Sequence, residues 1–215
     1  MKLVTLLFIA LFASIINAQE QQPVSFVTTD GGEIHANYFH TGPKAVVLAH
    51  GAIFNKESWQ GLIENLLKNN ISVLSIDFRG YGQSTSGKRP ADKYEDILAG
   101  VHFLNKKPEI THVSVLGASM GGSAAAQASI HSKTGDIKHL ILLSPAAFRE
   151  PEKIKSNTFY IASKNETITN NIKDLFKKTS APKKIHLLEG KAHAQHIFKT
   201  SQNKSLTELI INFLK

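Results

Sequence analysis

The sequence predicts an α/β fold with a mostly parallel central sheet, helices on both faces and an N-terminal β-hairpin. Short apolar runs alternate with longer amphipathic runs from residue 24 onward, and several of the short runs are nearly continuous in apolar residues. Such runs are typical of strands that are buried on both faces of a parallel sheet. Asp30-Gly31-Gly32 is a turn signal between the first two runs, so these runs are expected to pair as a hairpin.

The individual elements follow from the period of their apolar residues. The predicted strands are residues 24–29, 33–39, 44–50, 71–78, 112–118, 138–144, 157–163 and 183–190. The predicted helices are residues 56–70, 91–107, 119–132, 168–179 and 205–215. The sequence contains no internal repeat and no linker that would divide these elements between two domains.

The first residues are read as a targeting segment and kept apart from the fold. A basic start is followed by an apolar run over residues 3–16, which is short for a membrane span and typical of a secretory signal peptide. We expect residues 1–18 to be a signal peptide that is cleaved after Ala18, and residues 19–215 to form a single domain. The protein is then expected to be secreted or periplasmic, and an uncleaved N-terminal anchor is the alternative.

Composition narrows the function classes. The chain of 215 residues has no cysteine, which excludes disulfides, thiolate metal sites and a lipoprotein anchor. Its formal net charge of +8 comes from scattered lysines, with no basic block interleaved with aromatic residues. We therefore expect no nucleic-acid partner, and no stable membrane anchor once the signal peptide has been removed.

A lone serine lies where the strand 112–118 meets an alanine-rich helix. This is Ser119 in Gly117-Ala118-Ser119-Met120-Gly121, with a glycine two residues away on each side. Glycines at these positions permit a sharp turn between strand and helix, which lifts the serine hydroxyl out of the sheet. The G-x-S-x-G pattern in this context predicts a nucleophile elbow, and an ordinary turn serine is the alternative.

Four motifs in a fixed order resemble the α/β-hydrolase family, in a serine esterase branch with a minimal fold that lacks a cap domain. They are LAHG at 48–51, DFRGYGQS at 77–84, the elbow at 117–121 and EGKAHAQHIF at 189–198. The resemblance extends from about residue 24 to residue 215 and implies an α/β-hydrolase fold. Only residues 145–156 separate the sixth and seventh predicted strands, too few for a lid domain, so we expect an open site.

The resemblance also implies partners for Ser119, whose hydroxyl needs an adjacent base to become a nucleophile. The family's base follows the last strand, at His193, and His196 is its rival. The family's acid follows the strand 157–163, where Glu166 stands in place of the more common aspartate. A solvated loop glutamate is the alternative reading of Glu166, and Asp174 is the nearest rival acid.

The resemblance assigns the oxyanion-hole N–H groups to the backbone of Ala52 and Met120, which would stabilise developing negative charge. His50 is expected to shape its loop by hydrogen bonding. Trp59 is expected either near the pocket or in the core. The segment SPAAF at 144–148 is a candidate part of an acyl pocket.

The function predicted from these residues is that of an exported serine hydrolase. It would cleave small-molecule or polymer carboxylic esters through a Ser119–His193–Glu166 triad and an acyl-enzyme. No metal or organic cofactor is implied. An amidase or peptidase with the same triad and a non-catalytic binding module on the same fold are the alternatives. A metal site at His193 and His196 would lack a third ligand.

Overall fold

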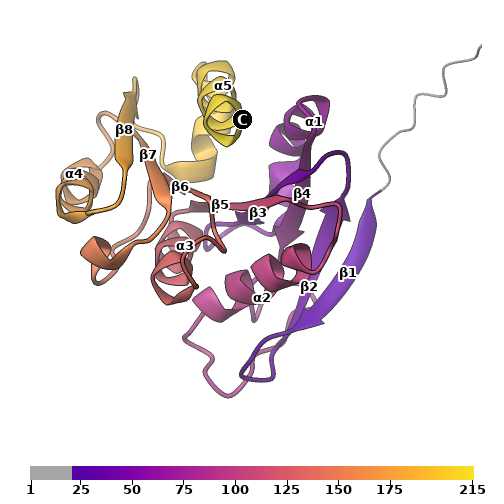
Figure 1. The fold of residues 1–215 in the computed structure, drawn as a ribbon. Helices are drawn as coiled ribbons and strands as arrows, with labels where there is room; N and C mark the ends of the chain where they lie inside the picture. Colours follow the sequence, from indigo (N-terminus) through magenta and orange to yellow (C-terminus); the bar gives the residue numbers. More distant parts are fainter. Residues whose placement is uncertain (1–20) are drawn as a thin grey trace, which may run out of the picture.

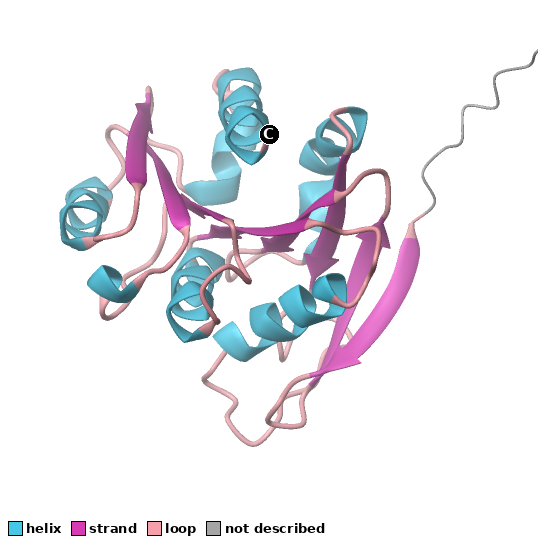
Figure 2. Ribbon diagram, in the orientation of Figure 1, coloured by secondary structure: helices cyan, strands magenta, loops and turns pink. Residues whose placement is uncertain are grey.

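The computed structural model describes residues 21–215, and the predicted signal peptide at residues 1–18 lies outside the described residues. One sheet runs through the centre of the described chain, and helices cover both of its faces (Figure 1, Figure 2). In chain order its strands are β1 (Gln22–Val27), β2 (Glu33–Phe39), β3 (Lys44–Ala49), β4 (Ile71–Ile76), β5 (His112–Ala118), β6 (His139–Leu143), β7 (Asn157–Ser163) and β8 (Lys183–Leu188). The predicted fold class is confirmed.

The order of strands across the sheet is β1-β2-β4-β3-β5-β6-β7-β8. The strands from β4 to β8 pair in parallel, whereas β1–β2 and β2–β4 pair antiparallel, so the predicted N-terminal hairpin is present. Strand order reverses at β3, because β4 lies on one side of it and β5 on the other. A ligand in an open α/β sheet binds at such a reversal, beyond the carboxyl ends of the strands.

Five α-helices cover the two faces within the described chain. They are α1 (Gln60–Lys68), α2 (Tyr94–Asn105), α3 (Met120–His131), α4 (Thr169–Lys178) and α5 (Asn203–Leu214). Helices α1 and α5 pack on one face, above the sheet in Figure 1, and their apolar residues share a core with Val46 and Leu48 of β3. Helices α2, α3 and α4 pack on the other face, in a core that includes Val47 of β3. Alternate residues of a strand point to opposite faces, so β3 contributes to both cores.

The short 3₁₀ helices refine the predicted boundaries. They are η1 (Lys56–Trp59), η2 (Pro151–Lys153) and η3 (Ala194–Lys199). The helix predicted over 56–70 therefore starts as η1, and the segment between β6 and β7 contains one helical turn, which agrees with the absence of a lid domain. The helix predicted from residue 91 begins at Tyr94. The N–H groups of Asp92 and Lys93 donate to the carbonyls of Arg89 and Ala91, which are bonds of turns and not of an α-helix. Trp59 is 1 % exposed and lies in the core.

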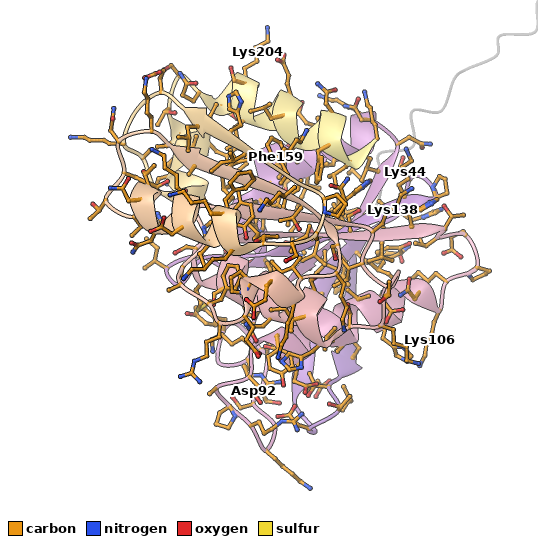
Figure 3. The ribbon with its side chains drawn as sticks, turned by 60° about the vertical axis from the view of Figure 1, so that its left-hand side comes forward. Lys44, Asp92, Lys106, Lys138, Phe159 and Lys204 are labelled. Atoms are coloured by element: carbon orange, nitrogen blue, oxygen red, sulfur yellow. The ribbon has the colours of Figure 1, made fainter. Side chains whose placement is uncertain are left out.

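The lysines of residues 21–215 are dispersed over the surface, whereas Arg79 is buried. Figure 3 labels Lys44 on β3, Lys106 after α2, Lys138 before β6 and Lys204 on α5. Over residues 21–215, the structure contains no helix that is both long and apolar enough to span a bilayer.

Candidate active site

Ser119 lies at the sharp turn between β5 and α3, at the carboxyl end of the sheet. Its φ of 52° and ψ of −113° are strained for a residue with a side chain. Gly117 and Gly121 permit this turn: a Cβ on Gly117 would lie 2.2 Å from the carbonyl oxygen of Gly121, and a Cβ on Gly121 would lie 2.2 Å from that of Ala49. The glycines on either side of the serine are therefore required by close backbone contacts.

His193 and Glu166 come to Ser119 from the loops after β8 and β7. The Ser119 hydroxyl lies 2.8 Å from Nε2 of His193, and Nδ1 of His193 lies 2.6 Å from Oε2 of Glu166. The carboxylate accepts from Nδ1–H, so Nε2 is free to accept the serine proton. The structure thus brings the three side chains into one hydrogen-bonded row, and His196 and Asp174 lie outside it.

Glu166 is buried and is held from two further directions. Its Oε1 accepts the N–H of Ser163 at 2.9 Å and the hydroxyl of Ser144 at 2.7 Å. The Ser144 oxygen in turn accepts the N–H of Ala194, next to His193, at 3.2 Å. This carboxylate is therefore part of a fixed network, which argues against a freely solvated loop side chain.

The segment after β3 runs beside the turn at Ser119 because β3 and β5 are neighbours, with Ala49 opposite Gly117. Gln195 joins this segment to the His193 loop: its Oε1 accepts the N–H of Gly51 at 2.7 Å, and its Nε2 donates to the hydroxyl of Ser58 at 2.7 Å. These contacts hold the segment that contains Ala52 at the carboxyl edge of the sheet, next to the turn that leads into Met120.

Tyr81 makes a second link to the same segment. Its hydroxyl donates to the carbonyl of Ala52 at 2.9 Å and lies 3.7 Å from Sδ of Met120. Tyr81 therefore contacts both Ala52 and Met120, the residues to which the family resemblance assigns the oxyanion-hole N–H groups.

His50 is fully buried and shapes its loop, as expected from the sequence. Its Nδ1 donates to the carbonyl of Gly51 at 2.8 Å, and its Nε2 accepts the N–H of Phe78 at 3.3 Å. Burial lowers the pKa of His50, because a charged imidazole would lose its hydration there. Both ring nitrogens are occupied, so His50 has no free atom for proton transfer.

Two hollows flank Ser119. The first, which we call the α3 groove, has a volume of about 270 Å³ and is lined by Tyr94, Met120, Ser123, Ala124, Gln127 and Ala146, among others. The second, which we call the His193 hollow, has a volume of about 570 Å³ and includes Lys191, Ala192, His193, His196 and Ser201. Both hollows are open to solvent.

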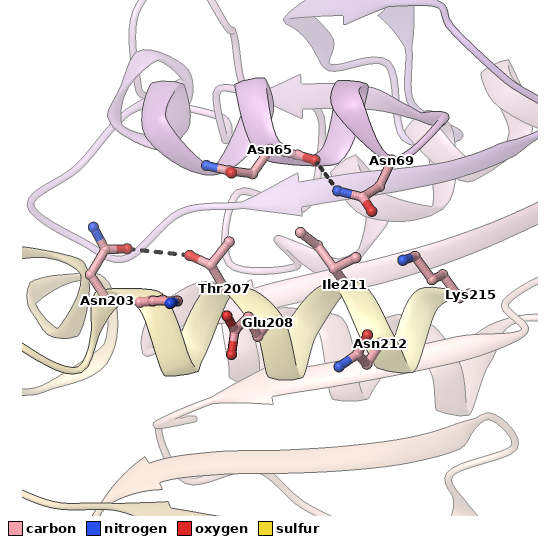
Figure 4. A pocket seen from close by; sticks show the side chains of 9 residues that line it. Asn65, Asn69, Asn203, Thr207, Glu208, Ile211, Asn212 and Lys215 are labelled. Carbon is pink, nitrogen blue, oxygen red and sulfur yellow. Dashed lines mark hydrogen bonds between the residues drawn. The ribbon is translucent and has the colours of Figure 1, made fainter.

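A third hollow of about 480 Å³ lies between α1 and α5, away from Ser119 (Figure 4). Its lining is polar, and two of its asparagine side chains bond to the backbone of their own helix, Asn65 to Gly61 and Asn69 to Asn65. Ser119, His193 and Glu166 are not part of it. Across residues 21–215, no group of three or more His, Asp or Glu side chains is arranged to hold a metal ion.

Ser144, Gln195 and Tyr81 are the residues at the site that sequence reasoning did not single out for these roles. Ser144 follows β6 at the carboxyl edge of the sheet, which is a weak positional signal. Tyr81 lies inside a motif that was noticed, but its contact with Ala52 depends on the loop geometry. Gln195 likewise lies inside the motif EGKAHAQHIF, but its contact with Gly51 depends on the folded chain.

Comparison with known proteins agrees with this fold. The family described as serine aminopeptidase, S33, matches residues 42–173, more than half of the chain. The chain therefore belongs to this family of α/β hydrolases.

Two curated relatives share moderate identity with parts of the chain. A thiohydrolase, aneE, of Aspergillus aculeatus is 34% identical over 142 residues, which cover 59% of this chain and 43% of that protein. The AB hydrolase superfamily protein YisY of Bacillus subtilis is 29% identical over 110 residues, covering 48% of this chain and 38% of that protein. The chain thus spans less than half the length of these relatives.

Among solved structures, the esterase Pf2001 of Pyrococcus furiosus superimposes with a TM-score of 0.79. The superposition covers 91% of this chain and 90% of that chain at 20% sequence identity. At this identity, the likeness concerns the fold.

Proposed function

We propose that this protein is a serine hydrolase that cleaves carboxylic esters through an acyl-enzyme. The observation that carries the proposal is the row from Glu166 through His193 to a strained Ser119 at the elbow. His193 is positioned to take the serine proton, and Glu166 to hold the imidazole in the required tautomer and to stabilise its charged form. An ester is favoured because the solved structure of Pf2001, which shares this fold, is described as that of an esterase.

The proposed reaction proceeds in two halves. Oγ of Ser119 attacks the ester carbon while Nε2 of His193 takes its proton, and the N–H groups of Ala52 and Met120 stabilise the oxyanion. His193 then protonates the departing alcohol, which leaves the acyl group on Ser119. Water, deprotonated by His193, attacks the acyl-enzyme. His193 then returns this proton to Oγ of Ser119 as the bond to the acyl carbon breaks and the carboxylic acid leaves.

A peptidase is the second candidate, because the matching family is described as serine aminopeptidase. The same three residues would serve, and an amide would replace the ester as the bond that is cleaved. Thioesters are a third candidate class of substrate, since the relative aneE is described as a thiohydrolase.

The test is hydrolysis of 4-nitrophenyl esters, with matched 4-nitroanilides and thioesters as the other arms. Ser119→Ala is expected to lower kcat by about 10³-fold or more, because the nucleophile is lost. Ser205→Ala, an exposed serine on α5, is the matched control and should keep full activity. Ester activity that persists in Ser119→Ala would sink the proposal, and activity on anilides alone would favour the peptidase.

We also propose export, on the strength of residues 1–18 of the sequence. Expression of the full chain in a bacterial host should yield a processed protein whose intact mass corresponds to residues 19–215. A full-length mass in the cytoplasmic fraction would contradict this proposal.

A further inference from the structure

The α3 groove and the His193 hollow lie next to Ser119, and apolar surface predominates in both, so the chemistry of the reaction must assign them to the two parts of a substrate. Met120 and Ala146 line the groove at the Ser119 end, and the N–H of Ala146 donates to the Ser119 carbonyl at 3.0 Å. The hollow includes the imidazole of His193. We propose that the groove receives the acyl chain and the hollow receives the alcohol, so that the substrates are esters of unbranched, largely apolar acids. This proposal rests on the proposed esterase function.

The direction of proton transfer assigns the two sides. When the bond between the acyl carbon and the alkoxy oxygen breaks, the alkoxide takes the proton that His193 received from Ser119. The alcohol must therefore lie within reach of Nε2 of His193, on the side of the His193 hollow. The acyl carbon is then bonded to Oγ of Ser119. Its chain extends to the side of Ser119 that lies opposite the His193 hollow, which is the side of the α3 groove.

The floor of the groove is one face of α3. Its lining residues Met120, Ser123, Ala124 and Gln127 follow the spacing of a single helical stripe. With a rise of 1.5 Å per residue, this stripe extends for about 10 Å. A volume of about 270 Å³ lies just below the usual range for drug-sized ligands, roughly 300 Å³ upward, and therefore suits a single chain.

The polar groups along this stripe already have partners. The Ser123 hydroxyl donates to the carbonyl of Ala147 at 3.1 Å, and Nε2 of Gln127 donates to the carbonyl of Arg149 at 2.9 Å. These bonds hold the segment after β6 against α3 as the second wall of the groove. Lys93 and Tyr94 also line the groove, and the rest of the surface left for a ligand is supplied mainly by apolar side chains such as Met120, Ala124 and Ala146.

Ala146 is the residue whose size should limit the acyl chain. It is half-buried, and its backbone is fixed against Ser119, so a larger side chain would occupy the groove next to the nucleophile. Ala147, the next residue, is exposed and does not line the groove. The two alanines therefore form a matched pair for substitution.

The experiment compares 4-nitrophenyl esters of acetic, butyric, hexanoic and octanoic acid, which share one alcohol. Each methylene buried in the groove raises kcat/KM by up to about fourfold in the native enzyme. Ala146→Leu is expected to lower the ratio of kcat/KM for hexanoate to that for acetate by about tenfold or more, since it blocks several methylene positions. Ala147→Leu should leave this ratio unchanged.

Ser201→Leu fills the His193 hollow instead, and Ala146→Val gives a smaller block should the leucine variant fail to fold. An unchanged ratio in both folded Ala146 variants would overturn the proposal, as would a ratio that responds to Ser201→Leu alone. A native enzyme that cleaves no ester would overturn the proposed function and this assignment with it. If the native enzyme cleaves esters but its ratio of kcat/KM for hexanoate to that for acetate is the same in the folded Ala146 variants, only the assignment of the groove to the acyl chain is overturned.

Discussion

Ser144 supports the proposed acid without touching the place where a substrate would bind. It is fully buried, has a positive φ of 44° and lies between Oε1 of Glu166 and the N–H of Ala194. A single hydroxyl therefore fixes both the carboxylate and the start of the loop that carries His193. We interpret it as a positioning residue that acts on Ser119 through these two partners.

Ser144→Ala should lower kcat by about 10- to 100-fold, because a hydrogen bond to a charged acceptor contributes about 1.5–3 kcal/mol. KM should change little, since Ser144 lies behind Glu166. The control is Ser132→Ala, which removes another buried hydroxyl, one that bonds to the carbonyl of Ser129. A purely structural role for Ser144 predicts that both variants lose similar thermal stability and that neither loses kcat.

At the level of elements, the site depends on three connections at the carboxyl edge of the sheet. The loop after β3 carries Ala52, the turn after β5 carries Ser119, and η3 follows His193. Gln195 on η3 reaches Gly51 from a position 144 residues further along the chain and is only 3 % exposed. It is thus a direct side-chain bridge between the loop of the proposed base and the loop of a proposed oxyanion donor.

Gln195→Met keeps the size of the side chain and removes both of its hydrogen bonds. The Gly51 N–H then loses its acceptor, and we expect a fall in kcat of about 10²-fold, comparable to the loss of one oxyanion donor. Gln195→Glu retains an oxygen for Gly51 and should lose less activity. Steady-state kinetics of the two variants test this expectation. An equal fall in kcat in both variants would show that the hydrogen bond accepted from the Gly51 N–H is unimportant for activity.

The elements themselves were largely predictable, whereas the links between them were not. Strands such as 44–50 and 157–163 could be found because their apolar runs are local, and the turn at Ser119 could be found because its glycines are adjacent in sequence. The bonds of Ser144 to Glu166 and of Gln195 to Gly51 join residues 22 and 144 positions apart. No periodicity records such pairs, so only the folded chain reveals them.

For the whole molecule, a buried ion-pair cluster joins the N-terminal hairpin to the rest of the sheet. The Arg79 guanidinium is fully buried, donates to both carboxylate oxygens of Asp30 at 3.0 and 3.1 Å, and donates from Nε to Asp96 at 2.7 Å. Asp30 belongs to the β1–β2 turn, Arg79 follows β4 and Asp96 lies on α2. The sequence marked Asp30 only as part of a turn, Arg79 only as part of the DFRGYGQS motif and Asp96 only as a position in a predicted helix, so the cluster is a structural finding.

Asp30→Asn should destabilise the molecule by about 3 kcal/mol at pH 7, because it leaves the Arg79 charge buried with one carboxylate fewer. The hydrogen bonds from Arg79 hold the pKa of Asp30 well below its usual value of about 4. A depressed pKa stabilises the native protein above pH 4, and this contribution is lost as the pH falls below 4. The difference between the native protein and Asp30→Asn should therefore be smaller at pH 3 than at pH 6.

Urea denaturation at these two pH values measures the difference directly. Asp174→Asn is the matched control, since it breaks an exposed pair with Lys177 and should cost about 0–1 kcal/mol. Ester hydrolysis at pH 7 should persist in folded Asp30→Asn, because the cluster does not contact Ser119 or His193. Equal stability losses in the two variants would mean that burial adds nothing to the Asp30–Arg79 pair. The hairpin would then be held to the sheet by its backbone ladder and its apolar side chains alone.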